Sequence, residues 1–132
     1  MELTAKDLFQ KVVDNKASDL HITVNLPPMI RISRSLMPLA GYSILNNDMI
    51  AGLLHQLLSD YQYKMLEENK ELDFSFSLGE TARFRANAFY QKGFLAASFR
   101  AIPFKIPTFD DLNLPEIVAE FTKLPRGLVL VT

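Results

Sequence analysis

The sequence predicts an α+β fold in which helices flank an antiparallel sheet. Two patterns carry this prediction. Apolar residues recur at helical spacing in the first half of the chain, and between residues 71 and 101 they alternate with polar residues, as in half-buried strands. Because 48% of the 132 residues are apolar and 22% are charged, the chain can bury a core of its own.

Two amphipathic helices are expected before residue 60. The first covers about residues 4–16, and Thr4 followed by Asp7 resembles a capping box at its start. The second begins at Asn46 or Asn47, either of which can cap it. Its apolar stripe is the strongest helical signal in the chain and comprises Met49, Ile50, Leu53, Leu54, Leu57 and Leu58.

Short strands are expected between these helices. Apolar and polar residues alternate from Asp19 to Val24, and Pro27-Pro28 ends that strand. Ile30 and Ile32 begin a second strand, and residues 36–39 are a candidate third.

An antiparallel meander is expected after a shorter helix at about residues 61–69. Its three strands cover residues 71–78, 82–91 and 95–101, each with one apolar face. The apolar faces of paired strands must coincide, and this requirement fixes the register.

The loop lengths of the meander follow from the register. A two-residue loop at the first turn would pair Leu78 with Thr81 and mix the faces, so a three-residue loop at 79–81 is expected, with a two-residue loop at Lys92-Gly93. The expected pairs are Leu78–Ala82, Phe76–Phe84, Phe74–Ala86, Tyr90–Leu95, Ala88–Ala97 and Ala86–Phe99.

The character of the chain changes beyond Ile102. Prolines at 103, 107 and 115 predict an extended linker and then a short helix at about residues 115–123. Residues 127–132 have the continuous apolar character of a buried strand in a parallel sheet, and no partner strands follow. The chain is therefore expected to be part of a longer protein.

Composition excludes several classes of function. The chain has no cysteine, which excludes disulfides, thiol nucleophiles and Cys-based zinc sites. Its net charge is −1 and its basic and acidic residues are interspersed, so the sequence predicts no basic patch for binding nucleic acid. The N-terminus lacks the pattern of a signal peptide, and the apolar run 128–131 is too short for a transmembrane segment, so a cytoplasmic protein is expected.

The predicted register places Arg85 directly opposite Arg100, with Arg83 on the same side of the sheet. Opposed like charges cost ~0.2–1 kcal/mol, and an anion would relieve them; arginine suits phosphate because its fork binds bidentately. One interpretation is an arginine clamp for phosphate. The alternatives are side chains that splay into solvent, or an ion pair of Arg85 with Asp73 diagonally across the neighbouring strand.

His21 shares the polar side of its strand with Asp19 and Thr23. An Asp-x-His pair could hold a metal or act as a base, but the second histidine, His55, has no acidic partner at ligand spacing. A structural or surface histidine is favoured, and no metal site is expected. No nucleophile triad, carboxylate cluster or Gly-rich phosphate loop is present, so the chain has no self-sufficient catalytic site.

Five motifs in fixed order resemble a known family. They are Ala-Ser-Asp-Leu-His-Ile at 17–22, Leu-Pro-Pro-Met-Ile-Arg at 26–31, Arg-Phe-Arg-Ala-Asn-Ala-Phe-Tyr-Gln at 83–91, Phe-Arg-Ala-Ile-Pro at 99–103 and Leu-Pro-Arg-Gly-Leu-Val-Leu-Val-Thr at 124–132. Together they span essentially the whole chain. In order and spacing they resemble the PilT/PilU-like type IV pilus retraction (twitching motility) ATPases of the type II/IV secretion ATPase superfamily.

This resemblance implies a domain organisation. It implies a PAS-like N-terminal domain over 1–102, a linker over 103–110, and the start of a RecA-like ATPase domain over 111–132, truncated just before the Walker A loop. The full-length protein would then be an ATPase that uses ATP and Mg²⁺, whereas the fragment is expected to be inactive and to bind neither.

The resemblance also implies roles for particular residues. Arg85 and Arg100 would contact ATP phosphates when the domains close, in the manner of arginine fingers, with Arg83 as a weaker third member. Ile102 and Pro103 would lie near the adenine. The implied partners are the chain's own ATPase domain, neighbouring subunits of a homo-hexamer and the pilus platform protein, at the inner face of the cytoplasmic membrane.

Two positions depart from the family pattern, which has glycine at position 16 and Asp-Gly at 33–34. Lys16 and Ser33-Arg34 stand there, which puts the tight turn at 33–34 in doubt. The branch, PilT-like or PilU-like, stays open. Alternative functions are the N-domain of a pilus-extension or type II secretion ATPase, or a free-standing PAS-like interaction module.

Overall fold

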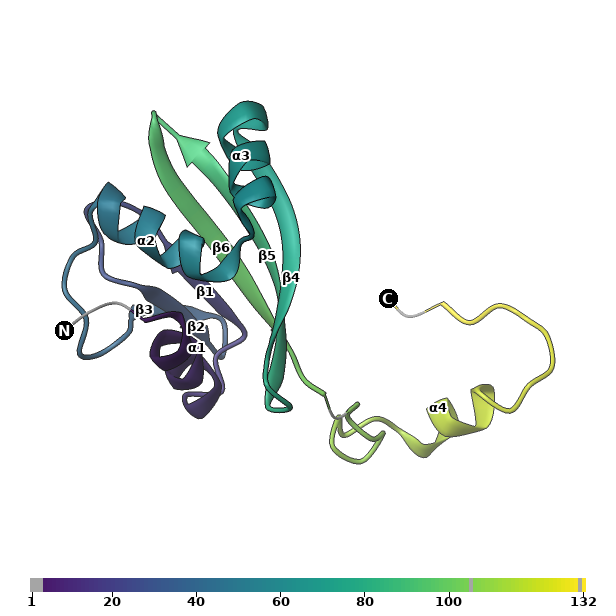
Figure 1. Cartoon of the computed structure of the whole chain (residues 1–132). Coiled ribbons are helices and arrows are strands. Elements are labelled where there is room, and N and C mark those ends of the chain that lie inside the picture. Colours follow the sequence, from purple (N-terminus) through teal and green to yellow (C-terminus); the bar gives the residue numbers. More distant parts are fainter. Residues whose placement is uncertain (1–3, 105, 131) are drawn as a thin grey trace.

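The computed structural model describes residues 4–104, 106–130 and 132, and its fold is α+β as expected (Figure 1). Its elements in chain order are α1 (Ala5–Asp14), β1 (Asp19–Ile22), β2 (Met29–Ile32), β3 (Ser35–Pro38), α2 (Asn47–Leu57), α3 (Asp60–Asn69), β4 (Glu71–Leu78), β5 (Ala82–Gln91), β6 (Phe94–Ile102) and α4 (Glu116–Phe121). The expected elements up to Ile102 are thus all present, with ends that differ by a few residues.

All six strands form one antiparallel sheet in the order β3-β2-β1-β6-β5-β4. The predicted register of the meander is confirmed at every expected pair, from Leu78 with Ala82 to Ala86 with Phe99. The position of β1 was not predicted: it lies in the middle of the sheet, hydrogen-bonded to β2 on one side and to β6 on the other.

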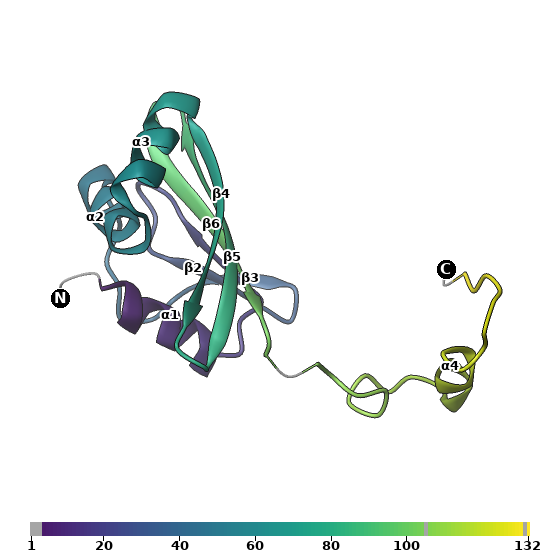
Figure 2. The ribbon, with the colours of Figure 1, turned by 45° about the vertical axis from the view of Figure 1, so that its right-hand side comes forward.

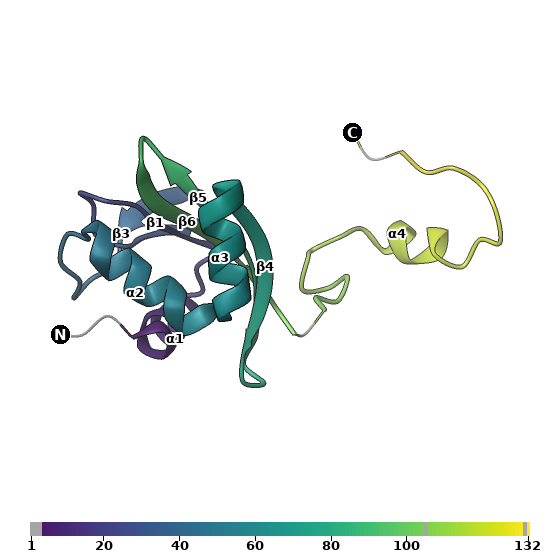
Figure 3. The same ribbon diagram turned by 45° about the horizontal axis from the view of Figure 1, so that its top comes forward.

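Helices α1, α2 and α3 cover one face of the sheet, which Figures 2 and 3 show from two directions. Phe9 of α1 is fully buried against this face, and its ring lies 4.8 Å, centroid to centroid, from each of Phe76, Phe84 and Phe99. Aromatic edge-to-face contacts at this distance add to the stabilisation from apolar burial. The helices thus leave the polar residues of the strands on the opposite face.

Side-chain caps start the three helices. The side-chain oxygen of Asn46, Oδ1, accepts from the backbone N–H of Met49 at 2.9 Å, which settles the choice between Asn46 and Asn47. Ser59 and Gln62 form a complete capping box at α3. At α1, Thr4 accepts from the backbone of Asp7.

The two departures from the family pattern are accommodated by strained backbone. Lys16 has φ +52°, and the backbone N–H groups of Lys16 and Ala17 bond to the carbonyls of Val13 and Val12, so α1 ends in a Schellman motif without glycine. Ser33 and Arg34 have φ +46° and +73° and connect β2 to β3. The tight turn that was in doubt is therefore formed.

The chain leaves the sheet after Ile102, and α4 lies away from it in all three views (Figures 1–3). The strand expected at 127–132 is not observed: residues 127–130 form no strand, and Val131 lies outside the described residues. A strand needs a hydrogen-bonding partner, and no described residue supplies one. Leu128 and Leu130 are 83% and 76% exposed.

Residues 1–3 and Lys105 also lie outside the described residues. The structure therefore does not test the expectation about a signal peptide, and it describes the linker only in part. Among the helices that are described, none is both long and apolar enough to cross a bilayer.

Candidate functional site

One row of side chains crosses the uncovered face of the sheet. Directly paired residues in an antiparallel sheet point to the same face, and five strands contribute one residue each to this row. The row consists of Arg31, Asp19, Arg100, Arg85 and Ser75, on β2, β1, β6, β5 and β4 respectively. The predicted pairing of Arg85 with Arg100 is therefore present, and its charges read plus, minus, plus, plus along the row.

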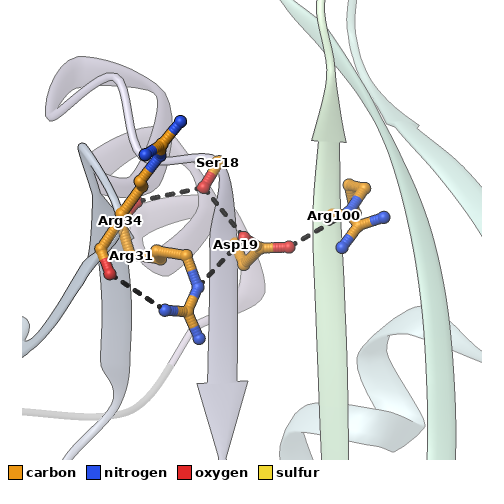
Figure 4. A network of polar contacts seen from close by, with 5 residues as sticks. All are labelled: Ser18, Asp19, Arg31, Arg34 and Arg100. Atoms are coloured by element: carbon orange, nitrogen blue, oxygen red, sulfur yellow. Dashed lines mark hydrogen bonds and ion pairs between the residues drawn. The ribbon is translucent and has the colours of Figure 1, made fainter. Parts of the chain in front are cut away.

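Asp19 is the negative member of the row, and its side chain is only 12% exposed. The Nε atom of Arg100 donates to its Oδ1 at 3.1 Å, and the Nε atom of Arg31 lies 3.5 Å from its Oδ2. The hydroxyl of Ser18 also donates to Oδ2, at 2.8 Å. Figure 4 shows the carboxylate between the two guanidinium groups.

The surroundings of Asp19 favour its ionised form. Burial alone would raise the pKa of the carboxyl group, but the hydrogen bonds from Ser18 and Arg100 and the charges of Arg100 and His21 outweigh burial and hold the pKa below its ordinary value of 3.8. Asp19 is therefore a fixed negative charge.

Arg85 has no comparable partner. Among the described residues no carboxylate lies within ion-pair distance of its guanidinium, and the side chain is exposed. The alternative pairing with Asp73 is not formed, and Asp73 instead accepts from the amide of Asn87 at 3.2 Å, which also donates to Glu71 at 3.0 Å. Arg85 is thus the row's unbalanced positive charge.

The two opposed arginines share one hollow of about 270 Å³ on the uncovered face. Its lining includes Asp19, His21, Asp73, Arg85, Asn87, Ser98 and Arg100. Guanidinium groups are suited to bind phosphate, and a hollow of this volume has room for a phosphate group. The structure therefore brings together the two residues that sequence analysis selected for phosphate contact.

The remaining candidates are Arg83, Ile102 and Pro103, which lie where β6 ends and the chain leaves the sheet. Arg83 is opposite Ile102 and donates to the hydroxyl of Ser75 at 3.3 Å. Ile102 lines a shallow hollow of about 440 Å³ with Arg83 and Arg85. Ile102 and Pro103 also line a separate, mostly apolar hollow of about 570 Å³. Pro103 does not reach the hollow that holds Arg85 and Arg100.

His21 lines the hollow that holds Arg85 and Arg100. Its Nε2 atom is buried, with no hydrogen-bond partner among the described residues. No three residues of the His, Asp or Glu type in the described part of the chain are placed to hold a metal ion. His55 stacks on Tyr63 at 3.7 Å.

Sequence reasoning missed the roles of Asp19 and Arg31. The alternation placed Asp19 on the polar side of its strand, which was the only available signal. Its contact with Arg100 spans 81 positions of the chain and depends on β1 lying beside β6. Local patterns do not determine such a pairing.

Known proteins resemble this chain in both sequence and fold. It is 41% identical over 116 residues to the type IV pilus retraction ATPase PilT of Pseudomonas aeruginosa, a match that covers 88% of this chain and 33% of that protein. It is 32% identical over 123 residues to the type IV pilus ATPase PilU of the same organism, covering 93% and 32% respectively. No protein-family model matches the chain.

The fold matches the crystal structure of the pilus retraction motor PilT with bound ADP. The TM-score is 0.77 at 37% identity, over 90% of this chain and 35% of that one. The chain thus has the fold of the N-terminal domain of a pilus motor ATPase. It is homologous to the PilT/PilU-like ATPases, and it spans about a third of the length of the relatives it matches.

Proposed function

We propose that this chain is the N-terminal part of an ATPase that drives type IV pilus retraction, and that Arg85 and Arg100 bind phosphate groups of ATP. The homology to PilT and PilU supports the first statement. The second rests on one observation: two exposed arginines are directly opposed on neighbouring strands, and Arg85 lacks a carboxylate partner among the described residues.

The charge row fits a phosphate at this position. An anion between Arg85 and Arg100 would turn the order plus, minus, plus, plus into a fully alternating one. Because the carboxylate of Asp19 already balances the other side of Arg100, the net charge of the row favours one further anion.

The other parts of an ATPase site are not in this chain. The printed sequence contains no Gly-x-x-x-x-Gly-Lys-Ser/Thr loop, and the described residues include no cluster suited to Mg²⁺. A phosphate loop and metal ligands from the rest of the protein would have to complete the site. The chain by itself is therefore expected not to hydrolyse ATP.

The arginines would act on charge rather than as bases. Phosphoryl transfer spreads negative charge over the oxygens of the transferred group, and donors aimed at those oxygens lower the barrier. In this proposal Arg85 and Arg100 supply such donors from the sheet, Arg83 adds positive potential beside them, and Ile102 and Pro103 contact the adenine.

A homo-hexameric assembly, contact with a platform protein of the inner membrane and a position at the cytoplasmic face of that membrane belong to the same proposal. The homology to PilT and PilU supports the assembly, and the contact with the platform protein fits a retraction function, because a motor must pull the pilus against a fixed base. The proposal assigns this chain contacts with its own ATPase domain and with neighbouring subunits.

The test is the ATPase rate of the full-length protein with Arg85→Ala and Arg100→Ala. Each variant should lower kcat by at least about 100-fold while nucleotide binding largely survives, because donors to developing charge act mainly in the transition state. Lys64→Ala, which removes an exposed positive charge on α3, should leave kcat unchanged. Normal turnover in both arginine variants would reject the phosphate role.

The reading frame provides an independent test. A native gene that continues beyond Thr132 into a Gly-x-x-x-x-Gly-Lys-Ser/Thr sequence agrees with the motor ATPase. A stop codon at that point would instead favour the free-standing interaction module.

A further inference from the structure

Asp19 contacts both flanking arginines at Nε, with a hydrogen bond from Arg100 and a longer ion pair to Arg31. It binds the Nε atom of Arg100 through Oδ1 and the Nε atom of Arg31 through Oδ2. No contact of Arg100 through its terminal nitrogens is found among the described residues, so both terminal groups remain available. A guanidinium held at Nε cannot rotate freely, and its two outer nitrogens therefore point in a fixed direction.

The carboxylate is itself held in place. Ser18 donates to the oxygen that faces Arg31, and the side chain is nearly buried on a central strand. The Arg31 guanidinium is anchored again by its Nη1, which donates to the carbonyl of Arg34 at 3.2 Å. Figure 4 shows this chain of contacts leading from the β2–β3 turn to Arg100.

Arg100 and Arg85 therefore differ in mobility although they are directly opposed. Arg100 is 75% exposed yet is tethered at its inner nitrogen, whereas Arg85 has no such tether among the described residues. A side chain that is already fixed before the ligand binds loses less conformational entropy on binding, so the free energy of binding is more favourable.

We propose that Asp19 is a positioning residue: it holds Arg100 by Nε so that the outer nitrogens of the guanidinium meet the phosphate that Arg85 also contacts. This inference rests on the proposed function, and Asp19 itself touches no substrate. Asp19 thus has a role in the site although it is not one of the residues proposed to contact phosphate.

Asparagine at position 19 is the sharpest variant. Both carboxylate oxygens accept contacts, Oδ1 from Arg100 and Oδ2 from Ser18 and Arg31. Asparagine has one acceptor oxygen and one amide donor group, so it cannot serve both arginines. It has nearly the same shape and removes a negative charge, so ground-state binding of an anion should not weaken.

The experiment is a double-mutant cycle on the full-length ATPase. Asp19→Asn should lower kcat by about tenfold with no rise in the Kd for ATP, as expected for a misaimed catalytic side chain. In the Arg100→Ala background the same change should have no further effect, because the residue through which Asp19 acts is gone. In the Arg85→Ala background it should keep its effect.

Arg31→Gln removes the other ion pair of the same carboxylate and keeps the bond to Arg100, so it should lower kcat less than Asp19→Asn does, and not at all in the Arg100→Ala background. Lys64→Ala, which removes an exposed charge on α3, is the control that should leave kcat unchanged. Thermal unfolding of each variant checks the fold. If Asp19→Asn does not fold, Ser18→Ala is the second variant, because it removes one hydrogen bond to the carboxylate and leaves the carboxylate in place. It should lower kcat less than Asp19→Asn, and this loss should also disappear in the Arg100→Ala background.

The outcomes separate the two proposals. Two results would overturn the positioning role and leave the phosphate role intact. Asp19→Asn could lower kcat equally in the wild type and in the Arg100→Ala background, or it could leave kcat unchanged although Arg100→Ala lowers it. Normal turnover in both Arg85→Ala and Arg100→Ala would reject the phosphate role and the positioning role with it.

Discussion

At the scale of single residues, the uncovered sheet face combines a carboxylate that contacts two arginines with a third arginine that has no carboxylate partner among the described residues. Asp19 accepts contacts from three side chains on one edge of the hollow, whereas Arg85 on the other edge has no carboxylate within reach among the described residues. A cross-strand pair of like charges destabilises a sheet unless something else gains from it. The cost of opposing two arginines is therefore an argument for a ligand.

The lowered pKa of Asp19 makes its stabilising effect depend on pH. A group whose pKa in the folded state lies below its unfolded value stabilises the fold above that unfolded value, near 3.8, and loses this effect as pH falls through the folded pKa. At neutral pH, Asp19→Asn should therefore lower the free energy of unfolding by roughly 1–3 kcal/mol, the usual worth of hydrogen bonds to a charged group.

Urea unfolding of this chain and of Asp19→Asn at several pH values measures the effect. The difference between the two proteins should be constant from neutral pH down to about 5 and should shrink below 3.8. The other carboxylates are common to both proteins and cancel. A difference that stays constant into the acid range would mean that the charge of Asp19 does not stabilise the fold.

Half of the site's electrostatics could be predicted from the sequence. Arg85 and Arg100 lie on strands joined by a two-residue loop, and apolar alternation together with loop length fixes which residues are opposed. Asp19 lies on a strand whose partner is far along the chain, so its contact with Arg100 needed the three-dimensional fold.

At the scale of elements, α1 ends with a residue that does not suit its backbone. Lys16 has φ +52°, a left-handed conformation that costs a non-glycine residue about 1 kcal/mol. Lys16→Gly should relieve this strain and stabilise the chain by about 0.5–1 kcal/mol, which raises Tm by a few degrees. Thermal unfolding followed by circular dichroism measures the shift.

Lys64→Gly is the matched control for this substitution, because Lys64 lies inside helix α3. There the same exchange of residues should destabilise by about 1 kcal/mol, the ordinary propensity cost of glycine in a helix. Destabilisation by both variants would show that the left-handed strain at Lys16 does not limit stability.

The sheet shows which element pairings a sequence can specify. Turns of two or three residues join β4 to β5 and β5 to β6, and both registers were predicted. The β1–β6 pairing, by contrast, joins segments separated by most of the domain, and either edge of the meander could have received β1. Ser33-Arg34 marks a third case: the residues argued against a tight turn, but pairing of β2 with β3 forms it at positive φ.

At the scale of the whole molecule, the chain divides into a packed part and an exposed part. The core cluster draws on residues from Ala5 to Ala101 and on no described residue beyond. Past residue 104 the apolar side chains are largely exposed, and they include Ile106, Phe109, Leu112, Leu114, Ile117, Phe121, Leu124, Leu128 and Leu130. Exposed apolar surface of this extent marks a segment that packs against something else.

Removing residues 105–132 should therefore not harm the folded part. A chain that ends at Phe104 should keep its Tm within about 2 °C, because none of the described side chains in the deleted segment belongs to the core. It should also scatter less light on concentration, because it lacks the exposed apolar side chains of that segment. Thermal unfolding and light scattering on both chains measure the two effects. A marked fall in Tm would mean that the segment packs on the sheet in solution. Its apolar side chains would then be part of this domain and would not be available to the ATPase domain that the proposed function places next to them.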